Sequence, residues 1–347
     1  MKIVYLSRNM EKYGGASYQQ DVMDELARQT QIHFYGPGFE GYDVRDSIDE
    51  VLVKAPFQPN AILLGHAWLN DRDGAEVDPH PRLDLSKTDI TKAVILNKEY
   101  VNLEKKLDYI RHNCFDLGFT HHHDTDRYMN ASGTEFTFWP FAYDPKKFRV
   151  SKYAKTFDLA FSGILQNLNL NAGQSDIRVR VMAHIFHTCN DVPLFKKKTY
   201  TDLNIFWNSI SRKQSGRYLS KILRKRKYLN DAQYAELVRN SKMYVNTLSP
   251  MGLVSPRFFE CMASGALVFC EESDIYRELF SEDIYVTFKK DLSDFDDKLF
   301  HYLAAHDERI TITEKAREEV LKNHTWKKRV GNLLREIKTL TGRNILA

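Results

Sequence analysis

The chain has 347 residues, of which 43% are hydrophobic and 28% charged, and its formal net charge is +4. A chain of this length exceeds the usual size of a single core, so we expect two domains. No apolar run approaches the roughly 20 residues that a membrane span needs, and the first residues lack the pattern of a signal peptide. The composition therefore predicts a globular, cytoplasmic protein rather than a membrane-spanning or secreted one.

Cysteines and basic residues narrow the class further. The 4 cysteines have no metal-binding spacing and lie mostly in apolar runs, so we expect buried free thiols in a reducing compartment. Basic residues concentrate at 196–198 and in the segment 212–228. This basic segment is either a solvated helical face or a surface for an anionic ligand or for peripheral contact with a membrane.

The first half of the chain alternates between strand-like and helix-like segments. An apolar strand at 1–7 is followed by a glycine-containing loop and by a helix-period segment at 17–29. Further strand-like runs follow at 32–36, 60–66, 92–97, 116–121 and 136–141. Polar helical stretches, of which 100–113 is the clearest, separate them, and this alternation predicts a doubly wound α/β domain over residues 1–145.

The second half repeats this order after a polar, proline-containing linker at 142–156. A strand at 157–163 again ends in glycine. Further strand-like runs follow at 203–208, 243–248 and 266–270. We therefore expect a second Rossmann-like domain over residues 156–347, with an alternative in which the last helix packs back on the first domain.

One short helix in the second half is predicted with particular detail. Ser255 suits its N-cap, Pro256 its first turn, and Gly265 the position just past its end. Strands precede and follow this helix, so the segment forms a parallel βαβ crossover. Its N-terminus then lies at the carboxyl edge of the sheet, where doubly wound folds bind phosphorylated ligands.

A loop with paired glycines is followed in order by "DLGFTHHHDTDRY", "FWPFAYDPKKF", "LAFSG", "SPRFFECMASGALVF" and "HTWKKRVGNLLREI". In these segments the chain resembles the GT-B glycosyltransferases of the group-1 type, which are retaining sugar-nucleotide transferases. The resemblance implies two Rossmann-like domains facing a central cleft, a nucleotide-sugar donor, a glycan or glycolipid acceptor, and no essential metal or other cofactor. One position departs from the pattern. Gly252 stands where many relatives carry the first of two glutamates, and Glu260 matches the second.

Arg257 and Glu260 are the main candidates in the second domain. Arg257 lies in the first turn of the predicted helix, where its guanidinium can grip phosphate oxygens and stabilise the leaving group. The alternative is an ion pair between Arg257 and Glu260, three positions apart on one helix face. The resemblance implies that Glu260 accepts hydrogen bonds from the ribose hydroxyls, and the alternative is an exposed helix charge.

Other candidates for contacting the donor are weaker. Gly14 and Gly15 allow backbone amides to approach the donor phosphates or sugar, although a plain turn explains them nearly as well. By resemblance, Ser162 and Gly163 line the donor, and Tyr228 lies near the nucleobase. Packing in the core is the alternative for the Tyr228 ring.

In the first domain the candidates follow predicted strands. Adjacent histidines on a strand end point to opposite faces, so the run at 121–123 cannot chelate one ion. The resemblance implies that one of them, for which we take His122, lies near the sugar. His66 and Asp71 are candidates for contacting the acceptor or acting as base, and Glu99 is a further base candidate. The sequence does not rank these residues.

Other functional classes remain for comparison. A dehydrogenase would carry G-x-G-x-x-G between its first strand and helix, and "SRNMEKYGGASY" lacks that pattern. A sugar-nucleotide epimerase of GT-B fold stays open, as does a catalytically degenerate GT-B module that only binds a partner or a glycan.

Overall fold

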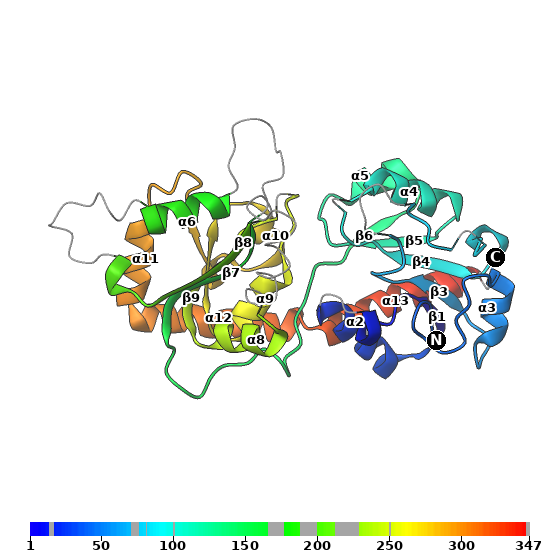
Figure 1. The fold of residues 1–347 in the computed structure, drawn as a ribbon, viewed down its shortest axis with the longest axis horizontal. Helices are drawn as coiled ribbons and strands as arrows, with labels where there is room; N and C mark the ends of the chain where they lie inside the picture. The colour runs from blue at the N-terminus through cyan, green and yellow to red at the C-terminus, as the bar shows by residue number, and fades with distance from the viewer. Residues whose placement is uncertain are drawn as a thin grey trace, which may run out of the picture. The chain divides into compact units, whose positions relative to one another are not determined.

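Figure 1 shows a computed structural model of the chain, which describes residues 1–13, 17–70, 76–80, 82–99, 101–165, 177–187, 200–211, 229–249 and 251–344. The chain forms two compact units. Unit 1 comprises Met1–Phe141 together with Trp326–Ala347, and unit 2 comprises Ala142–Thr325. Across the described ranges, no helix has the length and apolar character that a membrane crossing requires.

Unit 1 is built on a parallel sheet of 6 strands in the order β2-β1-β3-β4-β5-β6. The strands are β1 (Lys2–Leu6), β2 (Gln31–Tyr35), β3 (Ala61–Leu64), β4 (Thr91–Ile95), β5 (Leu117–Thr120) and β6 (Phe136–Phe138). The helices are α1 (Met10–Tyr13), α2 (Ser17–Gln29), α3 (Ile48–Lys54), α4 (Leu103–His112), α5 (Thr125–Ser132) and α13 (Trp326–Asn344), with a 3-10 turn at Leu85–Lys87. Since β2 and β3 lie on opposite sides of β1, the chain reverses its direction across the sheet there.

Unit 2 is built on a parallel sheet of 5 strands in the order β11-β10-β9-β7-β8. The strands are β7 (Phe157–Leu165), β8 (Ile205–Ser211), β9 (Ser241–Val245), β10 (Leu267–Glu271) and β11 (Val286–Phe288). The helices are α6 (Ile177–His187), α8 (Asp231–Arg239), α9 (Pro256–Ala263), α10 (Ile275–Leu279), α11 (Phe295–Ala304) and α12 (His306–Asn323), with 3-10 turns at Tyr200–Asp202 and Glu282–Ile284.

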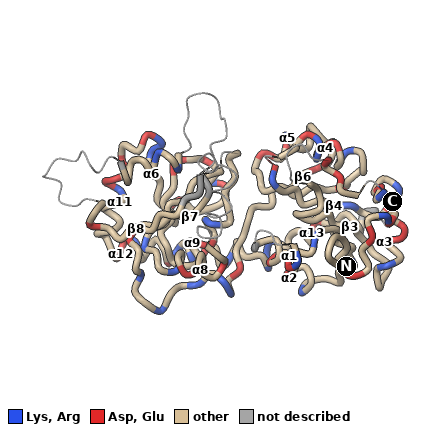
Figure 2. Tube along the Cα trace, in the orientation of Figure 1, with Lys and Arg blue, Asp and Glu red and all other residues tan. Residues whose placement is uncertain are grey.

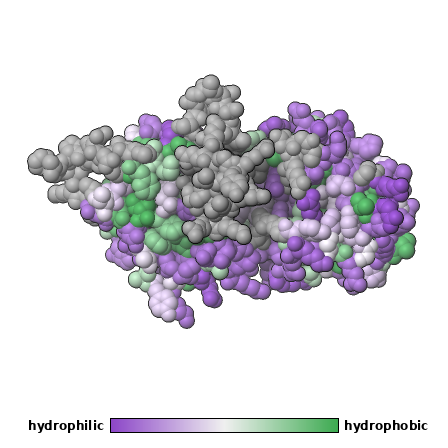
Figure 3. Space-filling view, viewed as in Figure 1, coloured by the Kyte–Doolittle hydropathy of each residue, from purple (hydrophilic) through white to green (hydrophobic). Residues whose placement is uncertain are grey.

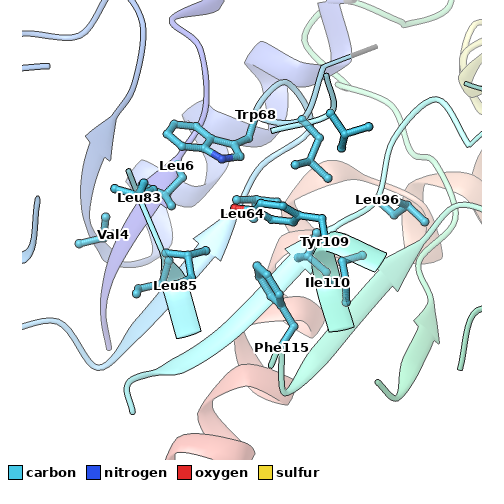
Figure 4. Close-up of a cluster of buried hydrophobic side chains, with 14 of the residues drawn as sticks. Val4, Leu6, Leu64, Trp68, Leu83, Leu85, Leu96, Tyr109, Ile110 and Phe115 are labelled. Carbon is cyan, nitrogen blue, oxygen red and sulfur yellow. The ribbon is translucent and has the colours of Figure 1, made fainter. Parts of the chain in front are cut away.

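The strands are apolar because helices cover both faces of each sheet. All four residues of β3 are buried, and charged residues lie mainly on helices and loops (Figure 2). In the core of unit 1, Trp68 and Tyr109 pack among aliphatic side chains from β1 and β3, including Leu6 and Leu64 (Figure 4). Among the coloured residues of the face seen in Figure 3, hydrophilic ones predominate, and the broadest apolar area lies around α6 and α11.

The predicted fold class, an α/β protein with two doubly wound parallel sheets, is confirmed. The strand β11 was not predicted because its apolar run is only 3 residues long. Burial of the cysteines was predicted correctly for Cys261 and Cys270, whereas Cys114 is exposed. Cys114 has a positive φ of 51°, in the turn that follows α4, and this turn places it at the surface.

The last helix, α13, packs against α2 and β4 of unit 1, although it follows unit 2 in sequence. Trp139 donates its indole N–H to the carbonyl of Arg329 (3.0 Å), and the Nε of Arg329 donates to the carbonyl of Pro140 (3.1 Å). Thr137 donates its hydroxyl to Glu336 (2.7 Å). These contacts join the end of the chain to the segment that leaves β6.

Two glycines of unit 1 offer a matched test of how closely the chain after β2 packs against the chain after β1. Gly36 (φ 143°) and Gly41 (φ 76°) both have positive φ, but a Cβ on Gly36 would overlap the carbonyl of Ser7, whereas a Cβ on Gly41 would meet nothing within 4 Å. We expect Gly41→Ala to lower the free energy of unfolding by about 1–2 kcal/mol through backbone strain alone. Gly36→Ala should cost roughly 1–3 kcal/mol more, because β1 and β2 must separate. Urea unfolding measures both values, and equal losses would contradict this packing.

Candidate functional site

The helix α9 begins and ends where its sequence predicts. Ser255 occupies the N-cap position and Pro256 the first turn, but the Ser255 hydroxyl makes no capping hydrogen bond. At the other end Gly265 has a φ of 68°, and the N–H of Ala266 donates to the carbonyl of Cys261 (3.0 Å). This is the Schellman arrangement that glycine favours, and it turns the chain sharply into β10.

A partly buried lysine fixes the C-terminal ends of α8 and α9. The amino group of Lys155 donates to the carbonyl of Arg239 (2.9 Å) and to that of Ser264 (3.1 Å). These carbonyls lie at the ends of the two helices, where the helix dipole favours a cation. Burial lowers the pKa of Lys155 to about 8. Lys155 therefore helps to hold α9 in the position from which Arg257 and Glu260 project.

Arg257 and Gly163 lie in contact at the carboxyl edge of the unit 2 sheet. A Cβ on Gly163 would stand 3.0 Å from Nη1 and 3.4 Å from Nη2 of Arg257, so the absence of a side chain on β7 leaves room for the guanidinium. Arg257 is half-buried, and within the described part of the chain its guanidinium has no hydrogen-bond or ion-pair partner. The predicted alternative, an ion pair with Glu260, does not form.

The surroundings of Arg257 keep it charged. Burial alone would lower the pKa of Arg257, but the acidic groups of Tyr234, Tyr244 and Glu260 outweigh burial and raise it. The Oη of Tyr234 donates to Oε2 of Glu260 (2.7 Å). Glu260 is only 9% exposed, so the alternative of a solvated helix charge is wrong. A cation with no partner among the described residues and a buried carboxylate thus lie together on α9.

Ser162 and the two tyrosines complete this cluster. The hydroxyls of Ser162 and Tyr244 are 2.6 Å apart and hydrogen-bonded, which joins β7 to β9 beside Gly163. The sequence predicts Ser162, Gly163, Arg257 and Glu260 as separate candidates, and the structure brings them into one region of unit 2. Sequence reasoning did not identify Tyr234 and Tyr244. Their only signal in the sequence is that they lie on a helix and on a strand next to α9.

A pair of buried charged residues supports the loop between β9 and α9. Arg178 donates from Nε to the hydroxyl of Thr247 (2.6 Å) and from Nη2 to the carbonyl of Leu248 (3.1 Å). The N–H of Leu248 donates to Oε1 of Glu271 (2.9 Å). Burial raises the pKa of Glu271 to about 7, although the Leu248 hydrogen bond and Arg178 act in the opposite direction. Arg178 and Glu271 therefore fix the start of the loop that leads to Arg257.

The same loop accounts for the missing first glutamate. Gly252 has a φ of 76°, and its N–H donates to the carbonyl of Ser249 (2.9 Å). An L-residue such as glutamate is strained in this left-handed conformation. The departure at this position is thus matched by a tight turn that favours glycine.

In unit 1, His66 and His121 form a buried pair. Their rings are stacked with centroids 5.4 Å apart, and their Nε2 atoms are 3.3 Å apart. The ring of Tyr18 meets His66 edge-on, and Phe141 stacks on His121 with centroids 3.8 Å apart. His66 follows β3 and His121 follows β5, so both lie at the carboxyl edge of the sheet.

Hydrogen bonding defines the tautomers of this pair. Nδ1 of His121 lies 2.8 Å from the carbonyl of Trp139 and must donate to it, which leaves Nε2 of His121 as an acceptor for the Nε2–H of His66. Nδ1 of His66 is then unprotonated, and it is buried with no hydrogen-bond partner in the described part of unit 1. Burial lowers the pKa of His121 to about 4, and burial together with His121 lowers the pKa of His66 well below its usual value. Both imidazoles are therefore neutral near pH 7.

The structure places His121, not His122, beside His66. The ring of His122 stacks on His123 with centroids 4.6 Å apart, and its Nδ1 accepts from the N–H of Asp124 (3.0 Å). The strand β5 ends at Thr120, so the alternation of faces no longer holds across the histidine run.

Glu99 has a structural role in the same region. Its Oε1 accepts from the hydroxyl of Thr120 (2.6 Å) and the N–H of His121 (3.2 Å), and its Oε2 accepts from the hydroxyl of Tyr128 (2.5 Å). Both carboxylate oxygens are thus occupied, and the group stabilises the end of β5 rather than serving as a free base.

Several sequence candidates lie outside the described residues. They are Gly14, Gly15, Asp71, Tyr228 and the basic segment 212–228. Within the ranges that the structure does describe, no group of three or more His, Cys, Asp or Glu side chains is arranged to hold a metal ion.

The tautomers of the histidine pair are directly testable. We expect the imidazole of His121 to stay neutral from about pH 8 down to about pH 5, and that of His66 to be neutral near pH 7, with His66 protonated at Nε2 and His121 at Nδ1. As the pH falls below about 6.5 the unfolded chain binds protons that this folded pair does not, so the pair lowers stability toward acid pH. Long-range 1H–15N NMR spectra, assigned with His66→Gln and His121→Gln, measure the tautomer and the titration midpoint of each ring. A titration midpoint above about pH 6 for either ring would contradict the burial argument.

Several solved structures share the fold of this chain. Residues 193–335 match a family described as "Glycosyl transferase-like", and no curated protein sequence matches the chain. Among solved structures, sucrose-phosphate synthase from Thermosynechococcus elongatus is similar with a TM-score of 0.63 at 10% identity, covering 99% of this chain and 100% of that one.

Two further structures have the same fold. Anabaena HepE in complex with UDP-glucose gives a TM-score of 0.62 at 12% identity, covering 98% of this chain and 100% of that one. An alpha-glucosyltransferase in complex with UDP and a 13-mer DNA gives 0.59 at 10% identity, covering 97% and 98%. The chain thus has the fold of these solved structures, and its residues 193–335 match the glycosyl transferase-like family.

Proposed function

We propose that the protein transfers a sugar, with retention at the anomeric carbon, from a nucleotide-sugar donor to a hydroxyl group of a glycan or glycolipid acceptor. The observation that carries the proposal is the guanidinium of Arg257, which lies against Gly163 without a partner among the described residues. A charge left unpaired at the carboxyl edge of a parallel sheet is suited to an anionic ligand. HepE and the alpha-glucosyltransferase, which share the fold, were solved with UDP-glucose and with UDP.

In this proposal Arg257 stabilises the departing diphosphate. The diphosphate gains negative charge as the glycosidic bond breaks, so a fixed guanidinium holds it more tightly in the transition state than in the ground state. The N-terminus of α9 adds its helix dipole at the same place. Arg257 therefore raises turnover rather than donor affinity.

Glu260 binds the ribose of the donor. Its Oε2 accepts from Tyr234, which fixes the orientation of the carboxylate. A carboxylate offers adjacent acceptor oxygens that match the two hydroxyls of a vicinal diol. Because Glu260 and Arg257 lie within one turn of the same helix, they contact adjoining parts of one nucleotide.

The first experiment identifies the donor nucleotide by thermal shift with UDP, GDP, TDP, ADP and CMP. A nucleotide at 100 times its dissociation constant should stabilise the protein by about 2.7 kcal/mol. Glu260→Gln should weaken binding of that nucleotide roughly ten- to a hundredfold, because it loses hydrogen bonds to a charged acceptor. If none of the nucleotides binds, the proposal fails.

Steady-state kinetics with the corresponding nucleotide-sugar then test Arg257. We expect Arg257→Gln to lower kcat about a hundred- to a thousandfold with a smaller change in KM. The matched control is Arg277→Gln, which removes an exposed arginine of unit 2 that pairs with Asp274 and Glu282, and it should leave kcat unchanged. A loss in kcat below about fivefold in Arg257→Gln would exclude the leaving-group role.

We also propose that transfer needs no metal ion, since a guanidinium and a helix N-terminus can stabilise the leaving phosphate. Turnover should therefore persist in excess EDTA. Complete loss of turnover on chelation, restored by manganese or magnesium, would refute this part of the proposal.

A further inference from the structure

A cavity of about 210 Å³ opens at the carboxyl edge of the unit 1 sheet. Its principal side chains are Arg8, Tyr42, Trp68 and His80, with Ala67 and two prolines completing the wall. It is smaller than the roughly 300 to 1,000 Å³ of sites for drug-sized ligands, so its size suits a single ring. All these residues belong to unit 1, and none of them contributes to the Arg257 cluster.

The topology of the sheet favours a ligand at this place. Arg8 follows β1, Tyr42 follows β2 and Trp68 follows β3. The strand order β2-β1-β3 reverses between β1 and β3. Open parallel sheets bind ligands outside the carboxyl ends of their strands at such a reversal.

Aromatic rings form one wall of the cavity. His80 stacks on Trp68 with ring centroids 4.1 Å apart, and the ring of Tyr42 meets His80 edge-on at 5.4 Å. The Tyr42 hydroxyl lies 3.2 Å from Nδ1 of His80. Trp68 is 1% exposed and His80 4% exposed, so both rings are packed on nearly all sides by the protein. Such a wall suits the apolar face of a ring.

Arg8 carries the charge of this cavity. Burial, with a smaller effect of Arg8, lowers the pKa of His80 to about 4, so His80 is neutral near pH 7. Among the described residues that line the cavity, Arg8 alone is then charged. Its guanidinium, half-buried, makes no hydrogen bond or ion pair with any described residue.

Of the described carboxylates, the two next in sequence to the lining residues have other partners than Arg8. Asp43 forms an ion pair with Arg45 (2.6 Å). Asp78 accepts from the backbone N–H of His80 (2.8 Å). A guanidinium without a protein partner is suited to bidentate contact with a phosphate or carboxylate group.

We propose that this cavity binds the acceptor, and that the acceptor carries a phosphate or carboxylate group on a hydroxylated ring. The guanidinium of Arg8 binds the anionic group, and the wall of Tyr42, His80 and Trp68 contacts the ring. This inference rests on the proposed function, because it assigns the substrate of the same transfer. It adds that Arg8 selects acceptors by charge.

Calorimetry with glucose, glucose 6-phosphate and glucuronate as probes tests the proposal. We expect at least one of the two anionic sugars to bind the wild type at least about tenfold more tightly than glucose. Arg8→Gln should weaken that anionic sugar roughly ten- to a hundredfold and leave glucose unchanged, and Arg8→Lys should lose less because the charge remains. The matched control, Arg111→Gln, removes an exposed arginine of unit 1 paired with Asp108, and it should bind as the wild type does.

The same samples are titrated with the nucleotide found by thermal shift. Wild type and Arg8→Gln should bind it equally, which also shows that the variant is folded. If the nucleotide binds but neither anionic sugar binds more tightly than glucose, or Arg8→Gln binds them unchanged, the inference is wrong while the proposed function stands. If the nucleotide competes with the anionic sugar, the cavity holds donor phosphates and the inference is also wrong. Absence of nucleotide binding in the wild type would instead refute the proposed function.

Discussion

Parallel strands cannot be joined by a hairpin, so every connection in the two sheets must return along a face before the next strand begins. This constraint places the carboxyl ends of all strands of a sheet at one edge. In unit 2 that edge brings Gly163 of β7 next to Arg257, which comes about ninety residues later in the sequence. In unit 1 it gathers the residues that follow β1, β2 and β3 around one cavity. The candidate functional residues are thus distributed along the sequence because the topology, not sequence proximity, assembles them.

Local chemistry made α9 predictable from the sequence. A proline in the first turn and a glycine just past the end restrict the backbone whatever surrounds it, and the helix begins and ends at the expected residues. The contacts of this helix were not predictable in the same way. Tyr234 binds Glu260 across 26 positions, and Glu271 binds the N–H of Leu248 across 23. Such partners depend on how the helices and strands pack, for which a single sequence carries no signal.

The histidine run shows where pattern reasoning reaches its limit. Alternation of faces holds only within a strand, and β5 ends at Thr120, one residue before the run begins. Which histidine turns inward is then decided by the partners available in the core. The Trp139 carbonyl and the Phe141 ring receive His121. Glu99 likewise looks like a free acid in the sequence, and becomes a structural group only because three hydrogen bonds reach it from β5 and α5.

Because α13 returns to unit 1, unit 2 is inserted between two segments of unit 1 in the sequence. Unit 2 is one continuous segment, whereas unit 1 is interrupted by it. The two ends of the insertion are adjacent, because Tyr143 forms a parallel bridge with Thr325 and donates its N–H to the carbonyl of His324 (3.2 Å). A short linker could therefore replace the whole insertion and still join its two neighbouring ends. A simple N-terminal fragment, by contrast, would lack α13 and leave the surfaces of α2 and β4 that it covers open to water.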